Sequence, residues 1–479
     1  MAKQPMLKFV NVSRDMPEKR AAEDRRTDFR EIYAEYAAEK AKEQASRCSQ
    51  CGVPYCQSHC PLHNNIPDWL RLTAEGRLKE AYEISQATNT FPEICGRICP
   101  QDRLCEGNCV IEQSGHGTVT IGSVEKYITD TAWEEGWVQP IAPTAERKES
   151  VAIIGAGPGG LAAADVLRRA GVQVTVYDRY DRAGGLLTYG IPGFKLEKEV
   201  VMRRNEQLEK GGVRFVLNCN VGEDISFEDI RAKHDAVIIA TGVYKSRDLG
   251  GPGSGANGIV KAIDFLTVSN RKSFGDTVPE FEDGTLNAAG KRVVVIGGGD
   301  TAMDCVRTSI RQGATSVKCL YRRDRANMPG SQREVQNAEE EGVVFEWLTA
   351  PKGFVESDGG VSGVIVEKMR LGAPDATGRQ APEVIEGSDY TEDADLVIKA
   401  LGFEPEDLPT LWDQPELKVT RWGTVKAAFG TGETELPDVY AVGDIVRGAS
   451  LVVWAIRDGR DCATAILDRM NAAGAVAAE

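Results

Sequence analysis

Cysteines are the first residues of this sequence whose spacing indicates chemistry. Of the 12 cysteines, eight lie between Cys48 and Cys109, in the stretches "CSQCGVPYCQSHCP" and "CGRICPQDRLCEGNC". Their spacings are C-x2-C-x4-C-x3-C-P and C-x3-C-x5-C-x3-C. Thiols crowded in this way are typical of a metal site, and eight thiolates suit two four-cysteine iron–sulfur clusters.

Two other uses of these thiols remain open. Structural zinc also accepts four thiolates, but it usually takes them from paired C-x-x-C knuckles, and only Cys48 and Cys51 form one. Redox-active dithiols are the second alternative. Disulfides are disfavoured, because residues 1–20 lack the apolar core of a secretory signal and we expect a cytoplasmic chain. The other four cysteines are isolated in the sequence, and we expect them to be buried and to pack as small hydrophobic residues: Cys219, Cys305, Cys319 and Cys462.

A glycine-rich loop, "GAGPGG", follows a strand predicted over 151–154. Gly155 permits a tight turn, Gly157 lets the backbone approach a pyrophosphate, and Gly160 allows close packing of the helix that follows. The next predicted strand ends in Asp178, where a carboxylate is placed to bind the ribose of an adenosine. The alternative is a glycine turn inside an ordinary α/β core.

A second loop repeats this pattern in "RVVVIGGGDTAMDC", with Gly297, Gly299 and Ala302 at the corresponding positions. The strand after it ends in Arg322 and Arg323 instead of an acid. Arginine at this position suits the 2′-phosphate of NADPH, although a solvated basic turn is the alternative. Two loops of different polarity therefore predict FAD in one unit and NADPH in the other.

Folded domains must hold these motifs in place. The length of 479 residues predicts about three such domains. We expect a helical domain over 1–140 that holds two 4Fe–4S clusters. A discontinuous FAD-binding domain is predicted over 141–265 and 405–479, and an NADPH-binding domain over 266–404. Continuous apolar runs such as "DAVIIATG" and "DLVIKALG" predict buried parallel strands in both α/β domains.

Two further segments are predicted from composition. The stretch 17–47 is charged and rich in Ala and Glu, with Phe29, Ile32, Tyr33 and Tyr36 at helical spacing, which predicts an amphipathic helix. The net charge of −15 argues against nucleic-acid or anionic-membrane binding. No run of about 18 apolar residues predicts a membrane span.

The motifs together resemble those of a known group of proteins. "VAIIGAGPGG", "GGLLTYGIPGFKL", "VVVIGGGDTAMDC", "YRRDRANMP" and "YAVGDI" are similar to motifs of glutathione-reductase-type flavoproteins. With the cysteine region, nearly the whole chain resembles the small (β) subunits of NADPH-dependent glutamate synthase and the N-terminal half of dihydropyrimidine dehydrogenase. The resemblance implies a helical iron–sulfur domain followed by two Rossmann-like dinucleotide-binding domains.

The resemblance also implies residue roles. For FAD it implies Gly155, Gly157, Gly160, Asp178, Gly185, Leu186, Lys195, Gly443 and Asp444. For NADPH it implies Gly297, Gly299, Asp300, Thr301, Arg322, Arg323, Ala400, Leu401 and Gly402. One 4Fe–4S cluster is implied at Cys48, Cys51, Cys56 and Cys109, and the second at Cys60, Cys95, Cys99 and Cys105.

The expected function is electron input. Flavin accepts two electrons as hydride and releases them singly, and iron–sulfur clusters accept single electrons, which gives the order NADPH, FAD, clusters. No amide-transfer site is evident, so the resemblance implies a hetero-oligomer with a large (α) glutamate synthase subunit that makes L-glutamate from L-glutamine and 2-oxoglutarate. The alternatives are an electron-transfer subunit of another complex, such as a ferredoxin:NADP oxidoreductase, and a zinc-stapled docking module.

Overall fold

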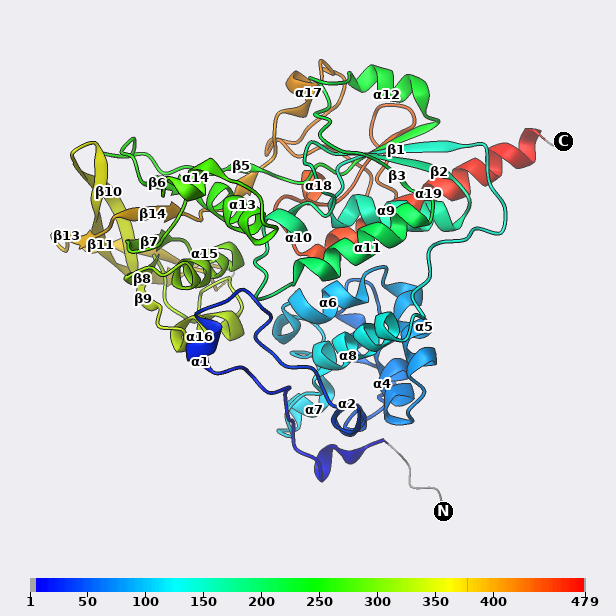
Figure 1. The fold of residues 1–479 in the computed structure, drawn as a ribbon, viewed down its shortest axis with the longest axis horizontal. Helices are drawn as coiled ribbons and strands as arrows, with labels where there is room; N and C mark the ends of the chain where they lie inside the picture. Colours follow the sequence, from blue (N-terminus) through cyan, green and yellow to red (C-terminus); the bar gives the residue numbers. More distant parts are fainter. Residues whose placement is uncertain (1–5, 377, 478–479) are drawn as a thin grey trace.

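The computed structural model describes residues 6–376 and 378–477, which form a helical domain and two α/β domains (Figure 1). In the helical domain the chain folds into α2 (Ala38–Ala45), α3 (Tyr55–Ser58), α4 (Ile66–Ala74), α5 (Leu78–Thr88), α6 (Pro92–Ile98), η2 (Gln101–Arg103), α7 (Val110–Gln113) and α8 (Ile121–Glu134). Trp69, Leu70, Val124 and Ile128 are buried in its core. Apolar residues at helical spacing therefore pack these short helices together.

The first α/β domain contains a five-stranded parallel sheet in the order β16-β4-β1-β2-β3. Its strands are β1 (Ser150–Ile154), β2 (Gln173–Tyr177), β3 (Arg214–Val216), β4 (Ala236–Ile239) and β16 (Val439–Ala441). Its helices include α9 (Pro158–Arg169), α10 (Leu186–Tyr189), α11 (Lys198–Lys210), α12 (Phe227–Lys233), α18 (Asp444–Arg447) and α19 (Val452–Ala477). Because β16 and α19 come from the end of the chain, this domain is built from two separate stretches.

The second α/β domain repeats the arrangement with a parallel sheet in the order β6-β14-β7-β8-β9. Its strands are β6 (Ile259–Lys261), β7 (Arg292–Ile296), β8 (Ser316–Tyr321), β9 (Val344–Trp347) and β14 (Leu396–Lys399). The helices are α13 (Ala262–Ser273), α14 (Pro279–Glu282), α15 (Asp300–Arg311) and α16 (Gln332–Glu340). The boundary expected between residues 265 and 266 falls inside α13, and β6 already pairs within this second sheet.

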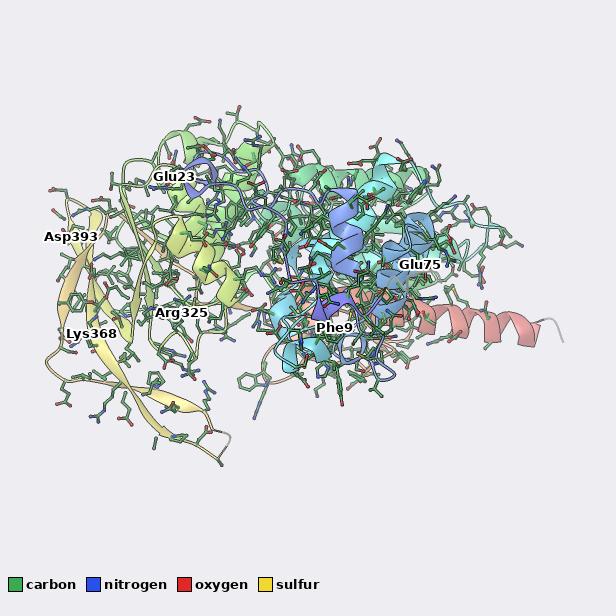
Figure 2. All side chains as sticks on the ribbon, turned by 90° about the horizontal axis from the view of Figure 1, so that it is seen from below. Phe9, Glu23, Glu75, Arg325, Lys368 and Asp393 are labelled. Carbon is green, nitrogen blue, oxygen red and sulfur yellow. The ribbon has the colours of Figure 1, made fainter. Side chains whose placement is uncertain are left out.

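An antiparallel sheet of four strands projects from the second domain. It consists of β10 (Thr349–Ser357), β11 (Gly360–Pro374), β12 (Gln380–Val384) and β13 (Tyr390–Asp393). Figure 2 shows this yellow arm, which carries Lys368 and Asp393, at the opposite end of the molecule from α19. The chain passes between the α/β domains at β5 (Lys245–Ser246) and β15 (Phe403–Glu404), which pair antiparallel; the short helix α17 (Leu408–Leu411) follows.

The single amphipathic helix predicted over 17–47 is wrong. Only α1 (Ala22–Arg25) and α2 are helical there, and the chain between them is extended. We call residues 16–37 the strap, because in Figure 1 this blue segment runs from α1 beside α16 to α2. Its apolar side chains contact different neighbours, and the Tyr36 hydroxyl donates to Thr120 Oγ1 at 2.9 Å. Helical spacing failed here because the buried residues do not share one face.

Among the residues described, no helix combines the length and the apolar character that crossing a membrane requires.

Candidate cofactor sites

All three domains and the strap border one large cavity of about 490 Å³. The strap contributes Ile32 and Tyr33, and the helical domain contributes Arg97 and Cys99. The glycine loops and their surroundings contribute Gly155, Gly157, Asp178, Leu186, Lys195, Asp300, Thr301, Gly443 and Asp444. Residues that are far apart in the sequence therefore meet in one chamber, with Cys99 in its wall.

The first glycine loop joins β1 to α9, and its three glycines have different surroundings. Gly155 has φ +111°, and a Cβ there would lie 2.3 Å from the Ala240 carbonyl oxygen. At Gly160 a Cβ would lie 2.1 Å from the Gly155 oxygen. At Gly157 a Cβ would meet nothing within 4 Å, because this residue borders the cavity. The turn and the helix contact thus require glycine, and the middle glycine leaves its backbone open to a ligand.

Asp178 follows β2 and lies in the wall of the same cavity. Its Oδ2 accepts the Ala156 N–H at 2.6 Å, and its Oδ1 accepts the Tyr180 N–H at 2.8 Å. Burial raises the pKa of Asp178, and these two hydrogen bonds act in the opposite direction. The carboxylate is therefore held in place by backbone amides, and the expected ribose contact stays a prediction.

The other residues predicted for FAD surround this loop. A Cβ on Gly185, which has φ +54°, would lie 2.9 Å from the Gly157 Cα, so these two backbones touch. Gly443 and Asp444, at the start of α18, border the cavity from the other stretch of the domain. Burial raises the pKa of Asp444 to about 6.

Lys195 connects the two α/β domains inside the cavity. Its Nζ donates to Asp304 Oδ1 on α15 at 2.9 Å and lies 3.9 Å from Glu334 Oε2. Burial lowers the pKa of Lys195, but the carboxylates of Asp304 and Glu334 outweigh burial and hold it above its ordinary value. The Lys195 ammonium group therefore lies at the junction of the two α/β domains. The FAD contact that the resemblance implied for Lys195 stays a prediction.

The second glycine loop joins β7 to α15 in the same manner. A Cβ on Gly297, which has φ +149°, would lie 2.2 Å from the Ala400 oxygen, so the Ala400–Gly402 turn after β14 packs directly against this loop. A Cβ on Gly299 would meet nothing within 4 Å. Ala302 is fully buried beneath the loop. The open side of this loop faces the helix N-terminus at Asp300, which supplies unpaired N–H groups to an anion.

Arg322 and Arg323 follow β8, outside the wall of the large cavity. The Arg322 side chain is exposed, and Arg323 Nε is buried without a hydrogen-bond partner among the described residues. Arg325 differs, because its Nη1 forms an ion pair with Glu339 Oε1 at 2.8 Å. The predicted 2′-phosphate contacts stay predictions.

The first predicted thiol set surrounds a smaller cavity. Cys48, Cys51, Cys56 and Cys109 all border it, together with Pro54 and Tyr55. Burial, and after it the neighbouring thiols of the set, raise the pKa of the Cys48 thiol to about 11 and that of Cys56 to about 12. In the part of the chain described, no three or more His, Cys, Asp or Glu side chains are arranged around a single-ion site.

The second predicted set reaches the large cavity, because Cys99 lies in its wall. A hydrogen bond with Cys95 and then burial raise the pKa of Cys99, and Cys105 acts on it in the same direction. Burial raises the pKa of Cys105, and Cys60 and Cys56 raise it further. Because these thiols influence one another, Cys60, Cys95, Cys99 and Cys105 lie close together, and the Cys56–Cys105 interaction shows that the two sets adjoin.

Sequence reasoning missed a charged cluster between the thiols and the large cavity. Arg97 Nε donates to Glu31 Oε1 of the strap at 2.6 Å, and its Nη2 donates to Asp130 Oδ2 at 2.7 Å. Lys126 pairs with the same Glu31. Glu31 Oε1 also accepts the Glu197 N–H of the first α/β domain at 3.3 Å. No spacing pattern predicts these contacts, because Glu31, Arg97, Asp130 and Glu197 are far apart in the sequence and lie on the strap, α6, α8 and the first α/β domain.

Comparison with known proteins identifies the group to which these features belong. Residues 25–137 match the family described as dihydropyrimidine dehydrogenase domain II, 4Fe-4S cluster, and residues 149–459 match pyridine nucleotide-disulphide oxidoreductase. The glutamate synthase (NADPH) small chain of Azospirillum brasilense is 68% identical over 466 residues, 97% of this chain and 96% of that protein. The chain belongs to this family of glutamate synthase small chains. The resemblance seen in the motifs is thereby confirmed.

Other small chains and related oxidoreductases extend this relationship. The Escherichia coli glutamate synthase (NADPH) small chain is 47% identical over 97% of this chain and 99% of that protein. A putative oxidoreductase of Escherichia coli, AegA, is 47% identical over 95% of this chain and 70% of that protein. Among solved structures, FprA of Mycobacterium tuberculosis shares the fold, with a TM-score of 0.58 and 23% identity over 69% of this chain and 86% of that protein.

Proposed function

We propose that the chain is the NADPH-oxidising, electron-input subunit of a glutamate synthase. Electrons pass from NADPH through FAD and two 4Fe–4S clusters to a large subunit that makes L-glutamate from L-glutamine and 2-oxoglutarate. The single observation that carries this proposal is the shared cavity, where both α/β domains meet the helical domain at Cys99. The family of small chains supports the same function.

FAD is assigned to the first α/β domain. The residues that hold it in this proposal are Gly155, Gly157, Gly160, Asp178, Gly185, Leu186, Lys195, Gly443 and Asp444. The fit rests on the open backbone of Gly157 beside a wide cavity, where no side chain competes with a pyrophosphate. When bound, FAD supplies the capacity to accept an electron pair and to release single electrons.

NADPH is assigned to the second α/β domain, at Gly297, Gly299, Asp300, Thr301, Arg322, Arg323 and the Ala400–Gly402 turn. The open backbone at Gly299 supports a phosphate there. Arg322 and Arg323 are suited to the 2′-phosphate because they follow the strand next to the loop and Arg322 is solvent-accessible. Lys195 and Asp304 join the two α/β domains, and Gly157 of the first loop and Asp300 after the second loop border the same chamber.

Two 4Fe–4S clusters are assigned to the helical domain, one to Cys48, Cys51, Cys56 and Cys109, and the second to Cys60, Cys95, Cys99 and Cys105. Buried thiols with raised pKa values are costly to leave unbound as thiolates, and iron would compensate this cost. The second set borders the large cavity through Cys99, and the first set borders the smaller cavity.

The chain's own residues shape the chamber between these sites. The strap lines it with Ile32, which is buried, and Tyr33, which is half-buried. Arg97 places a guanidinium in the wall beside Cys99 and is held there by Glu31 and Asp130. The proposed domains are those expected from the sequence, 1–140, 141–265 with 405–479, and 266–404, except that the limit between the two α/β domains lies before β6, because β6 and α13 belong to the second domain. The proposed assembly is a cytoplasmic hetero-oligomer with the large subunit.

The test uses the chain purified without oxygen, alone and with its natural partner. We expect bound FAD, iron and acid-labile sulfide, NADPH oxidation with an artificial electron acceptor, and glutamate formation only when the large subunit is present. A colourless protein without iron, or glutamate formation by the isolated chain, would contradict the proposal. Co-purification with a partner other than a large glutamine-dependent subunit would favour the second candidate, an electron-transfer subunit of another complex.

A further inference from the structure

Arg103 of the helical domain reaches across to the second α/β domain. It is the last residue of η2 and lies two positions before Cys105. Its Nη1 donates to the Pro329 carbonyl oxygen at 2.6 Å, and its Nη2 donates to Asp300 Oδ2 at 3.4 Å. A cation from the cysteine region therefore lies at the loop that sequence and fold assign to a nucleotide.

The carboxylate that Arg103 contacts, Asp300, lies at the second glycine loop. It is the first residue of α15, directly after the open glycine Gly299, and it borders the large cavity. Its Oδ1 accepts the Ser331 N–H at 3.0 Å. The helix N-terminus attracts the pyrophosphate of a dinucleotide, but an unpaired carboxylate at the same place repels it. The site therefore needs a cation beside Asp300.

The ion pair between Arg103 and Asp300 contributes little to the stability of the fold. The Arg103 side chain is 43% exposed and that of Asp300 is 40% exposed. Pairs with this exposure contribute about 0 to 1 kcal/mol to the free energy of unfolding. A ligand that covers the pair removes water from it and strengthens every charge interaction there.

A reciprocal contact holds η2 in the required position. Arg333, which follows the first residue of α16, donates from Nη1 to Gln101 Oε1 at 3.1 Å and lies 3.4 Å from Glu106 Oε2. The Gln101 side chain is itself buried and donates to the Gly96 carbonyl at 3.1 Å. One arginine thus crosses the interface in each direction, and Arg103 is anchored on a short, rigid element.

We infer that Arg103 is a positioning residue for NADPH: it neutralises the Asp300 carboxylate so that the pyrophosphate can approach the N-terminus of α15. The inference rests on the proposed NADPH site. The nucleotide site then includes a residue of the iron–sulfur domain, and nucleotide affinity depends on how that domain docks. Because the pyrophosphate is common to both nicotinamide nucleotides, Arg103 acts equally on NADP⁺ and NAD⁺.

The experiment is a double-mutant cycle on the holoprotein, with Arg103→Gln, Asp300→Asn and the two combined. The dissociation constants of NADP⁺ and NAD⁺ are measured by titration without oxygen. Arg71→Gln, another exposed arginine of the helical domain, is the matched control. Iron, sulfide and flavin contents are measured on every variant, so that damage near Cys105 is recognised.

We expect Arg103→Gln to weaken both nucleotides about tenfold, with KM raised more than kcat is lowered. Asp300→Asn should bind at least as tightly as the parent, and Arg103→Gln should then have little further effect. Two results would overturn the inference. One is an unchanged nucleotide affinity in Arg103→Gln. The other is an equal loss of affinity when Arg103→Gln is made in the parent and when it is made in Asp300→Asn. A parent protein that binds no NADP⁺ would instead contradict the proposed function.

Discussion

Glu93 and Arg204 form a doubly hydrogen-bonded ion pair where the helical domain meets the first α/β domain. Arg204 Nε donates to Glu93 Oε1 at 2.7 Å, and Arg204 Nη2 donates to Glu93 Oε2 at 3.0 Å. Only 2% of the Arg204 side chain and 0% of the Glu93 side chain are exposed. The pair joins α6, which carries Cys95, to α11, so it fixes the iron–sulfur domain on the domain proposed for FAD.

Breaking this pair should destabilise the protein strongly. We expect Arg204→Met to lower the free energy of unfolding by about 3 to 5 kcal/mol, because Glu93 is left buried without a partner charge. Adding Glu93→Leu should recover most of that loss. Urea unfolding of the holoprotein measures both effects. Arg77→Ala, at the exposed Arg77–Glu80 pair, is the control and should change little. If the single and the double variant lose the same free energy of unfolding, the unpaired charge of Glu93 is not the cause of the loss.

The two thiol sets should hold separate clusters. We expect Cys51→Ala to lower the iron content from about eight to about four atoms per chain, and Cys99→Ala to do the same, because each removes a ligand of a different four-iron cluster. Iron and acid-labile sulfide are measured on protein kept without oxygen. Cys219→Ser, far from both sets in the sequence, should keep the parent content. Zinc in place of iron in the parent would rule out this assignment.

Arg322 should select NADPH over NADH. Its exposed guanidinium follows the strand beside the second glycine loop, and a charge-assisted hydrogen bond contributes about 1.5 to 3 kcal/mol. We expect Arg322→Ala to raise KM for NADPH at least about tenfold and to leave KM for NADH nearly unchanged. Steady-state kinetics with both nucleotides decide this. Arg325→Ala is the matched control, since Arg325 is occupied by Glu339. Equal changes for both nucleotides would argue against a 2′-phosphate contact.

Asp444 should make stability depend on pH. Burial raises its pKa in the folded chain from 3.8 to about 6, so the folded state binds this proton more tightly than the unfolded state. The contribution is therefore fully present below the unfolded pKa and is lost as pH rises through about 6. We expect Asp444→Asn, which cannot ionise, to gain stability relative to the parent over this window, by on the order of 3 kcal/mol.

The measurement for Asp444 is urea unfolding of both proteins, each freed of FAD, from about pH 4.5 to about pH 7.5. Other titrating groups cancel in the difference between variant and parent. A difference that stays constant over this range would contradict the pKa given above.

Some of these features were predictable from sequence because they depend on neighbours in the chain. The strands before Gly155 and Gly297 are continuous apolar runs, and the helices after them follow from local spacing. The strap was predicted wrongly, since Ile32 and Tyr36 are buried by different parts of the molecule. Arg97 and Arg103 were not predicted at all, because their partners Glu31 and Asp300 are distant in the sequence, Glu31 on the strap and Asp300 in the second α/β domain. Contacts of this kind carry no periodic signal.

The two-part construction of the first α/β domain affects how the protein is made. Its sheet lacks β16, and α9 lacks the packing of α19, until residues 439–477 have been synthesised. The two helices touch so closely that a Cβ on Gly459 would lie 2.1 Å from the Gly159 oxygen. The second α/β domain is continuous and is synthesised earlier, so it folds first. The proposed FAD site is therefore completed only after residues 439–477 have been synthesised, later than the sheet of the second α/β domain.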